Sequence, residues 1–121
     1  TYKGPKQQHA VKTRREIELP LADGTKSAEQ WAELLTLLGF RAVVTVRKRR
    51  EEGALIWKNR QVNVALDRVD GLGHFCEIEL SVEENETSAA QQLVQSLADH
   101  LGLNEVERRS YLELLLAARK V

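Results

Sequence analysis

Hydrophobic and polar residues alternate, one by one, along four stretches of this 121-residue chain. Because neighbouring side chains of a strand point to opposite faces, such alternation predicts β-strands in which every second residue shares a face. The expected strands cover residues 11–19, 41–51, 54–67 and 74–82, after the tail of another strand at residues 1–3. Residues typical of turns separate these strands. Gly4-Pro5 ends the strand tail at residues 1–3, Glu52-Gly53 ends the strand at 41–51, and Asp70–Gly73 precedes the last strand.

Apolar residues spaced three and four apart predict three helices. Their apolar stripes are Trp31-Leu34-Leu35-Leu38, Leu93-Leu97-Leu101 and Tyr111-Leu114-Leu115-Ala118. The first is expected to begin at Ser27, the second covers residues 88–100, and the third follows Asn104. Ser27 and Asn104 are the expected N-caps, since Gln30 and Glu107 stand three residues after them. The expected order is one strand, a helix, three strands and two helices, joined by short connections. This order predicts a single α+β domain with an antiparallel sheet and helices packed on one face.

Charged residues gather on one face of this predicted sheet. In the last strand Phe75, Glu77 and Glu79 face away from the core, to which Cys76, Ile78 and Leu80 point. The charges that alternation places in rows are Lys3, Lys12, Arg14, Glu16, Glu18, Lys48, Arg50, Asp67, Glu77 and Glu79. Carboxylates of this kind suit Mg²⁺ or Mn²⁺, and the cations suit phosphate oxygens. The same pattern also fits a solvated sheet face, whose cross-strand ion pairs contribute only ~0.2–1 kcal/mol each.

The overall charge narrows the classes of partner. Lys and Arg together number 18, as do Asp and Glu, so the net charge is zero, whereas a nucleic-acid binder carries a net basic face. A strand also splits the basic run Arg47–Arg50 between its two faces. No apolar run approaches the ~20 residues of a membrane span. The single cysteine, Cys76, cannot form an internal disulfide, which favours a reducing, cytoplasmic setting.

Five segments match one known pattern in order along nearly the whole chain. They are residues 1–5 (Thr-Tyr-Lys-Gly-Pro), 14–18 (Arg-Arg-Glu-Ile-Glu), 46–51, 66–79 and 110–115. The most specific is 66–79, which holds Leu-Asp and then Gly-Leu-Gly-x-Phe-x-Glu-Ile-Glu. With these segments the chain resembles the CYTH superfamily, which takes in class IV adenylate cyclases, thiamine triphosphatases and inorganic triphosphatases.

The resemblance implies an eight-stranded antiparallel tunnel, charged inside, with helices outside, so that the charged face lines the tunnel. It assigns the triphosphate to Lys3, Arg14, Lys48 and Arg50, with Lys12 as a looser match. It gives Glu77, Glu79 and Asp67 as catalytic carboxylates, and Glu77, Glu79, Glu16 and Glu18 as ligands of Mg²⁺ or Mn²⁺. Arg47 and Arg49 are expected to point outward.

The activity implied by the resemblance is metal-dependent chemistry on a small triphosphate such as ATP, thiamine triphosphate or tripolyphosphate. The first expectation is an adenylate cyclase that converts ATP to cyclic AMP and pyrophosphate. A thiamine- or inorganic-triphosphate phosphohydrolase would use the same tunnel. A non-catalytic module that binds polyphosphate or nucleotide needs the cations but not the carboxylates. Neither a membrane nor a nucleic acid is an expected partner.

One departure from the family pattern concerns the start of the chain. The family opens with a Glu-x-Glu-x-Lys strand, a helix and two further strands, none of which precedes Thr1. The chain also contains no methionine, so Thr1 is not the expected translated start. Residues 1–121 are therefore expected to be the C-terminal two-thirds of one CYTH-like domain. Alone it is expected to be inactive or much reduced, unless a second chain, as in a homodimer, completes the tunnel.

Overall fold

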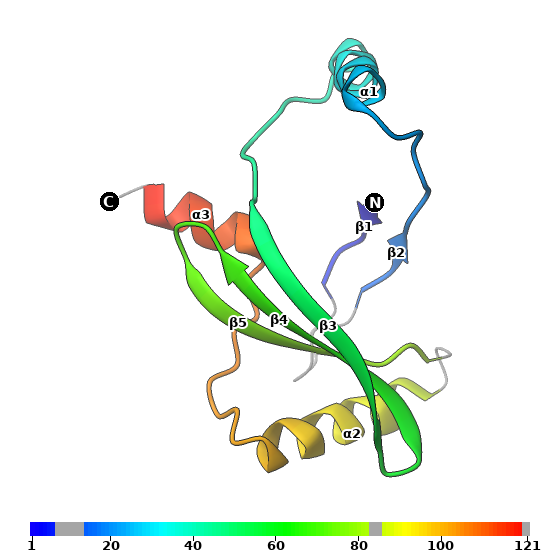
Figure 1. The fold of residues 1–121 in the computed structure, drawn as a ribbon, viewed down its shortest axis with the longest axis vertical. Helices are drawn as coiled ribbons and strands as arrows, with labels where there is room; N and C mark the ends of the chain where they lie inside the picture. Colours follow the sequence, from blue (N-terminus) through cyan, green and yellow to red (C-terminus); the bar gives the residue numbers. More distant parts are fainter. Residues whose placement is uncertain (7–13, 83–85, 120–121) are drawn as a thin grey trace.

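A computed structural model describes residues 1–6, 14–82 and 86–119 of the chain (Figure 1). Its strands are β1 (Tyr2–Lys3), β2 (Glu16–Ile17), β3 (Lys48–Trp57), β4 (Arg60–Val69) and β5 (Gly73–Glu79), and its helices are α1 (Thr25–Leu37), α2 (Thr87–His100) and α3 (Tyr111–Arg119). All strand pairs are antiparallel, in a β1–β2 ladder and a β3–β4–β5 sheet. The predicted α+β class with antiparallel sheets is therefore confirmed. Within the described residues these strands do not close into a barrel, so the tunnel stays a prediction.

The β3–β4 hairpin runs past the predicted break. β3 continues through Glu52 and Gly53, which pair with Ala65 and Val64 of β4, and the chain turns only after Trp57. The turn residues Lys58 and Asn59 have φ of 48° and 64°, the left-handed conformation that matches the twist of a two-residue hairpin. The predicted break at Glu52-Gly53 is wrong, because the ladder to β4 holds this stretch extended on both sides of the glycine.

Two predicted strands are shorter in the structure than their alternation indicates. Residues 41–47 have no ladder partner in the described part of the chain, and β3 begins only at Lys48. Of the strand predicted over residues 11–19, only Glu16–Ile17 is paired, and residues 11–13 lie outside the described residues. Alternation predicts which residues share a face, but a strand also needs a neighbour to accept its hydrogen bonds.

Both predicted helix N-caps are wrong. α1 begins at Thr25, two residues before Ser27, and its N-cap Gly24 makes no side-chain cap hydrogen bond. α3 begins at Tyr111, where the hydroxyl of Ser110 accepts from the Glu113 N–H at 3.2 Å and the Glu113 carboxylate accepts from the Ser110 N–H. This is a capping box, displaced from the predicted one. The Glu107 carboxylate instead accepts from the backbone N–H of Arg109, which holds it in the preceding loop.

The hydrophobic core lies between α2 and one face of the β3–β4–β5 sheet. The Trp57 indole donates to the Ser96 hydroxyl at 2.8 Å, and its ring lies 4.7 Å from that of His100. Val62 and Leu97 are almost fully buried. Cys76 shares this face, as predicted, and burial raises the pKa of its thiol. Leu66, on the same face but farther from the hairpin turn, remains 56% exposed.

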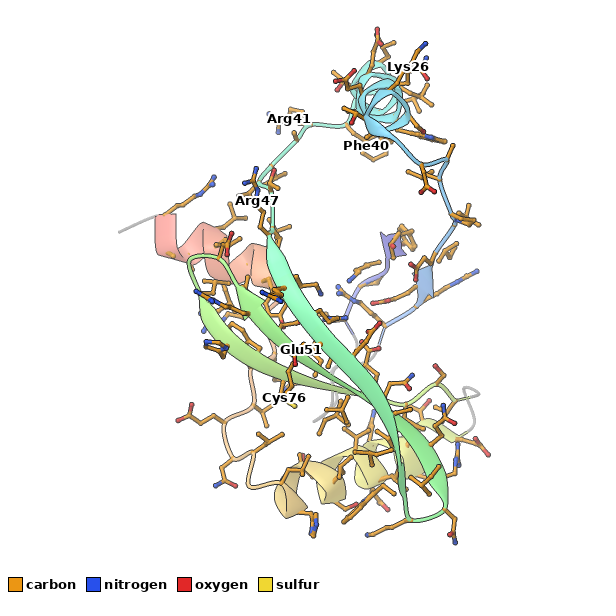
Figure 2. The ribbon with its side chains drawn as sticks, in the orientation of Figure 1. Lys26, Phe40, Arg41, Arg47, Glu51 and Cys76 are labelled. Atoms are coloured by element: carbon orange, nitrogen blue, oxygen red, sulfur yellow. The ribbon has the colours of Figure 1, made fainter. Side chains whose placement is uncertain are left out.

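The helices do not share one layer. α2 covers the apolar face of the sheet, α3 contacts the opposite face, and α1 stands apart on two extended connections (Figure 1). No residue of α1 is buried, and Trp31 of its apolar stripe is 41% exposed. Figure 2 shows Phe40 and Arg41 on the connection that follows α1, away from the sheet. The prediction of helices packed on one face therefore holds for α2 only. None of the described helices has the length and apolar character needed to cross a membrane.

Candidate functional site

Strand register brings many of the predicted site residues onto one face of the β3–β4–β5 sheet. Arg50 pairs with Asp67 and Asp67 with Phe75, while Glu77 lies across from Ala65 and Glu79 across from Asn63. We call this surface the charged face; it carries Lys48, Arg50, Glu52, Asn63, Asp67, Phe75, Glu77 and Glu79. Arg49 lies on the opposite face beside Arg68, as expected. The pleat therefore places Lys48 and Arg50 on the charged face and Arg49 on the other face of the sheet.

Asp67 and Arg50 form the centre of the charged face. The Arg50 guanidinium donates from Nε to Asp67 Oδ1 at 2.7 Å and from Nη2 to Asp67 Oδ2 at 2.6 Å. Arg50 Nη2 also donates to Glu77 Oε2 at 2.8 Å. Asp67 is only 2% exposed, and a charge so buried is stable only when it is paired and hydrogen-bonded. The hydrogen bond between the two side chains lowers the pKa of Asp67 below its usual range and raises the pKa of Arg50.

Tyr111 and Lys48 complete the surroundings of Asp67. The Tyr111 hydroxyl donates to Asp67 Oδ2 at 2.7 Å, and Lys48 Nζ lies 3.5 Å from the same oxygen. The Tyr111 ring lies 5.0 Å from the Phe75 ring, and Lys48 Nζ is 5.5 Å from the Tyr111 ring centroid. Burial and the hydrogen bond to Asp67 raise the pKa of Tyr111, so the hydroxyl stays a donor.

Sequence reasoning missed Tyr111 as a site residue and placed it only in the apolar stripe of the last helix. The available signals were its place in the matched segment 110–115 and the need of a buried tyrosine hydroxyl for a partner. Glu52 and Asn63 were also missed. With Arg50, Ala65, Glu77 and Glu79 they line a shallow depression on the charged face. Alternation alone would have placed both on this face.

The β1–β2 ladder carries a second set of predicted site residues. Lys3 lies opposite Glu16 with its Nζ 4.0 Å from Glu16 Oε1, and Arg14 Nε donates to that oxygen at 3.2 Å. Glu18 lies beyond the end of β2, and Lys12 lies outside the described residues. Within residues 1–6, 14–82 and 86–119, no hydrogen bond or ion pair joins Lys3, Arg14 or Glu16 to the charged face. Among the described residues, the two sets are therefore not linked by direct polar contacts.

Two carboxylates of the charged face, Glu77 and Glu79, are the side chains to weigh as metal ligands. The part of the chain that the structure describes holds no group of three or more His, Cys, Asp or Glu placed to bind a metal. Glu77 and Glu79, however, lie two residues apart on one face and line the same depression. Mg²⁺ in phosphate enzymes commonly takes one or two carboxylates and fills its other positions with water and phosphate oxygens. Glu16 and Glu18 belong to the β1–β2 set and are not grouped with them.

Comparisons with known proteins agree on one family. The profile of the CYTH domain matches residues 1–111. “Putative adenylate cyclase MJ0240” of Methanocaldococcus jannaschii is 36% identical over 117 residues, which cover 94% of this chain and 62% of the relative. “Adenylate cyclase CyaB” of Aeromonas hydrophila is 32% identical over 87 residues, covering 69% of this chain and 44% of the relative.

A solved structure is also similar to the chain. The PH1819 protein from Pyrococcus horikoshii OT3 is 42% identical, with a TM-score of 0.83. The match covers 97% of this chain and 63% of that protein. The chain therefore spans less than two thirds of the length of each of these three relatives.

Proposed function

Because the chain belongs to the CYTH family, we propose that its charged face binds the triphosphate of a small-molecule substrate as part of a metal-dependent enzyme. The observation that carries the proposal is the Arg50–Asp67 pair, a cation fixed on the sheet by a buried carboxylate with Lys48 beside it. Two relatives carry adenylate cyclase in their names, which supports a triphosphate such as ATP as the substrate.

Arg50 has donors to spare for a phosphate. A guanidinium has five N–H groups, of which Nε and Nη2 of Arg50 are directed at Asp67 and Glu77. Among the described residues nothing accepts from the two N–H groups of Nη1. The carboxylates therefore fix the plane of the guanidinium and leave one side of its fork for phosphate oxygens, which bind arginine well. Lys48 adds a second cation on this face. Lys3 and Arg14, which contact Glu16 of β2, are the proposed cations outside it.

Glu77 and Glu79 are the proposed metal ligands on this face. A bound Mg²⁺ or Mn²⁺ would neutralise negative charge on the phosphate oxygens of the leaving group. Asp67 is fully engaged with Arg50, Lys48 and Tyr111, so its proposed contribution is to orient cations. Glu77 is proposed both to orient Arg50, which donates to its Oε2, and to bind the metal ion through its other oxygen.

The reaction that the relatives favour is cyclisation of ATP. In a cyclase the ribose 3′ hydroxyl attacks the α-phosphorus and pyrophosphate leaves. Hydrolysis is the second candidate, since water attacking the terminal phosphorus would use the same cations and carboxylates. One observation favours it: among the described residues, the depression on the charged face is lined by Arg50, Glu52, Asn63, Glu77, Glu79 and aliphatic side chains, with no aromatic ring for a base to stack on. The aromatic rings of this face, Phe75 and Tyr111, lie instead beside Asp67.

Product analysis distinguishes these activities. The full-length protein is incubated with ATP, thiamine triphosphate or tripolyphosphate in Mg²⁺ or Mn²⁺. Cyclic AMP with pyrophosphate identifies a cyclase, and a shortened phosphate chain with free phosphate identifies a hydrolase. Binding without any product would contradict an enzyme and indicate a non-catalytic phosphate-binding module.

Two substitutions test the carboxylates. Glu77→Gln and Glu79→Gln are expected to lower metal-dependent turnover at least about tenfold, the loss typical of a removed metal ligand or its support. Glu51→Gln is the matched control, because Glu51 is on the opposite face of the same sheet, across from Leu66. Turnover unchanged in both variants of the charged face would overturn the proposed use of these carboxylates.

A further inference from the structure

The first turn of α3 contacts both the charged face and the segment that follows β1. From one side of this turn the Tyr111 hydroxyl reaches Asp67 of β4 at 2.7 Å. From the other, the Glu113 carboxylate forms an ion pair with Lys6, which follows β1, and Lys6 Nζ also donates to the carbonyl of Arg108 at 2.9 Å. The capping box of Ser110 and Glu113 fixes this turn. α3 is therefore the element through which the β1 segment and the charged face meet.

Three donors converge on one oxygen of Asp67. Oδ2 accepts from Tyr111 at 2.7 Å and from Arg50 Nη2 at 2.6 Å, and Lys48 Nζ lies 3.5 Å away. The carboxylate is buried, so water has little access to replace a lost donor. If the hydroxyl is removed, the carboxylate loses one of the contacts that fix its rotation. Both oxygens of the Asp67 carboxylate accept from Arg50, so rotation of the carboxylate would also rotate the guanidinium plane.

We propose that Tyr111 is a positioning residue, whose hydroxyl holds Asp67 so that Arg50 and Lys48 stay where they meet a triphosphate. Docking of α3 on the charged face thereby sets the affinity of the site. The inference rests on the proposed function, since it assigns Tyr111 to the support of the same cations.

Substitution by phenylalanine isolates the hydroxyl. The ring contact with Phe75 and the position under Lys48 need only the aromatic ring, so Tyr111→Phe keeps both. Tyr2→Phe is a matched control, because it removes the same atom from a tyrosine that is 58% exposed on β1. These are the chain's two tyrosines.

Calorimetric titration with tripolyphosphate tests the proposal. Tyr111→Phe is expected to weaken binding about 3- to 10-fold, the size of the net contribution of one ordinary hydrogen bond, because the hydroxyl acts on the ligand only through Asp67, and Tyr2→Phe is expected to leave it unchanged. Wild-type protein that binds no triphosphate would overturn the proposed function. Wild-type protein that binds, together with Tyr111→Phe that binds equally well, would overturn this inference alone.

Two further readouts separate positioning from a general loss of structure. In an Asp67→Asn background, Tyr111→Phe is expected to have no further effect on affinity, since the hydroxyl acts through that carboxylate. The carboxyl carbon of Asp67, followed by NMR against pH, is expected to titrate at higher pH in Tyr111→Phe than in wild type or Tyr2→Phe. An equal loss of affinity in the Asp67→Asn background, or an unchanged titration of Asp67, would contradict the proposal.

Discussion

Asp67 shows at the scale of a single residue why the charged face is stable. Its carboxylate is buried yet accepts from Arg50 and Tyr111 and has Lys48 nearby, so none of its charge is left without a partner. Truncating one partner of such a group generally costs more than the pair contributes, because the other charge is left buried. Asp67 therefore ties the stability of the fold to the arrangement of the cations.

The stability of the protein should fall in acid because of this carboxylate. The pKa of folded Asp67 lies below its ordinary value of about 3.9, so as pH falls the unfolded chain takes up a proton first. The stabilisation is complete above about pH 4 and is lost as pH falls through the folded pKa. Glu113, with a pKa lowered to about 2 by Lys6, acts in the same direction.

Urea unfolding between pH 2 and pH 7 measures this dependence. Asp67→Asn should be less stable at neutral pH and should lose less stability on acidification than wild type. Asp23→Asn is the control, since no ion pair of Asp23 is present within residues 1–6, 14–82 and 86–119. An identical acid slope in Asp67→Asn and wild type would contradict the account of Asp67.

The sequence predicted those parts of the site that depend on the alternation of side chains within a strand. It did not predict those that depend on packing between elements far apart in the chain. Alternation and the family resemblance placed Arg50, Asp67 and Glu77 together, and the ladders β3–β4 and β4–β5 confirm that they share a face. Tyr111 is 44 positions from Asp67, and only the docking of α3 brings them together. A helical stripe shows that Tyr111 is packed, but not which sheet face receives it.

At the scale of elements, β3 shows how a ladder overrides local propensity. Glycine next to glutamate predicts an interruption, yet Gly53 lies in the middle of a ten-residue strand. Its φ is not in the left-handed region, and a Cβ built there would meet no atom within 4 Å. The predicted helix starts are also wrong. Ser27 and Asn104 have suitable chemistry for an N-cap, but the helices begin at Thr25 and Tyr111.

Substitution of Gly53 tests this continuity. Gly53→Ala should raise the free energy of unfolding by about 0.5–1 kcal/mol, because alanine loses less backbone entropy than glycine on entering a strand. Gly71→Ala is the contrasting variant and should destabilise, since Gly71 has φ of +78° in the β4–β5 turn. Chemical denaturation of both variants gives the comparison. A destabilised Gly53→Ala would support the break that the sequence predicted.

At the scale of the whole molecule, the order of strands and helices was predictable but the closure of the sheet was not. β3 and β5 are the edges of an open sheet in the described residues, and the apolar stripe of α1 covers nothing in them. The chain spans less than two thirds of the relatives that it matches, so their activities enter only as the proposal made above. The triphosphate site proposed here rests on the charged face, which the register of β3, β4 and β5 defines.

The most direct test removes one positive charge from each face of β3. Lys48 and Arg49 are neighbours in sequence, but Lys48 lies beside Asp67 on the charged face whereas Arg49 lies across from Arg68 on the other. Calorimetric titration with tripolyphosphate at fixed ionic strength is then compared for Lys48→Gln and Arg49→Gln. The account predicts at least about tenfold weaker binding, ~1.4 kcal/mol, for Lys48→Gln and less than about twofold for Arg49→Gln. Equal weakening by the two substitutions would show that only net charge matters, and would contradict a triphosphate site on the charged face.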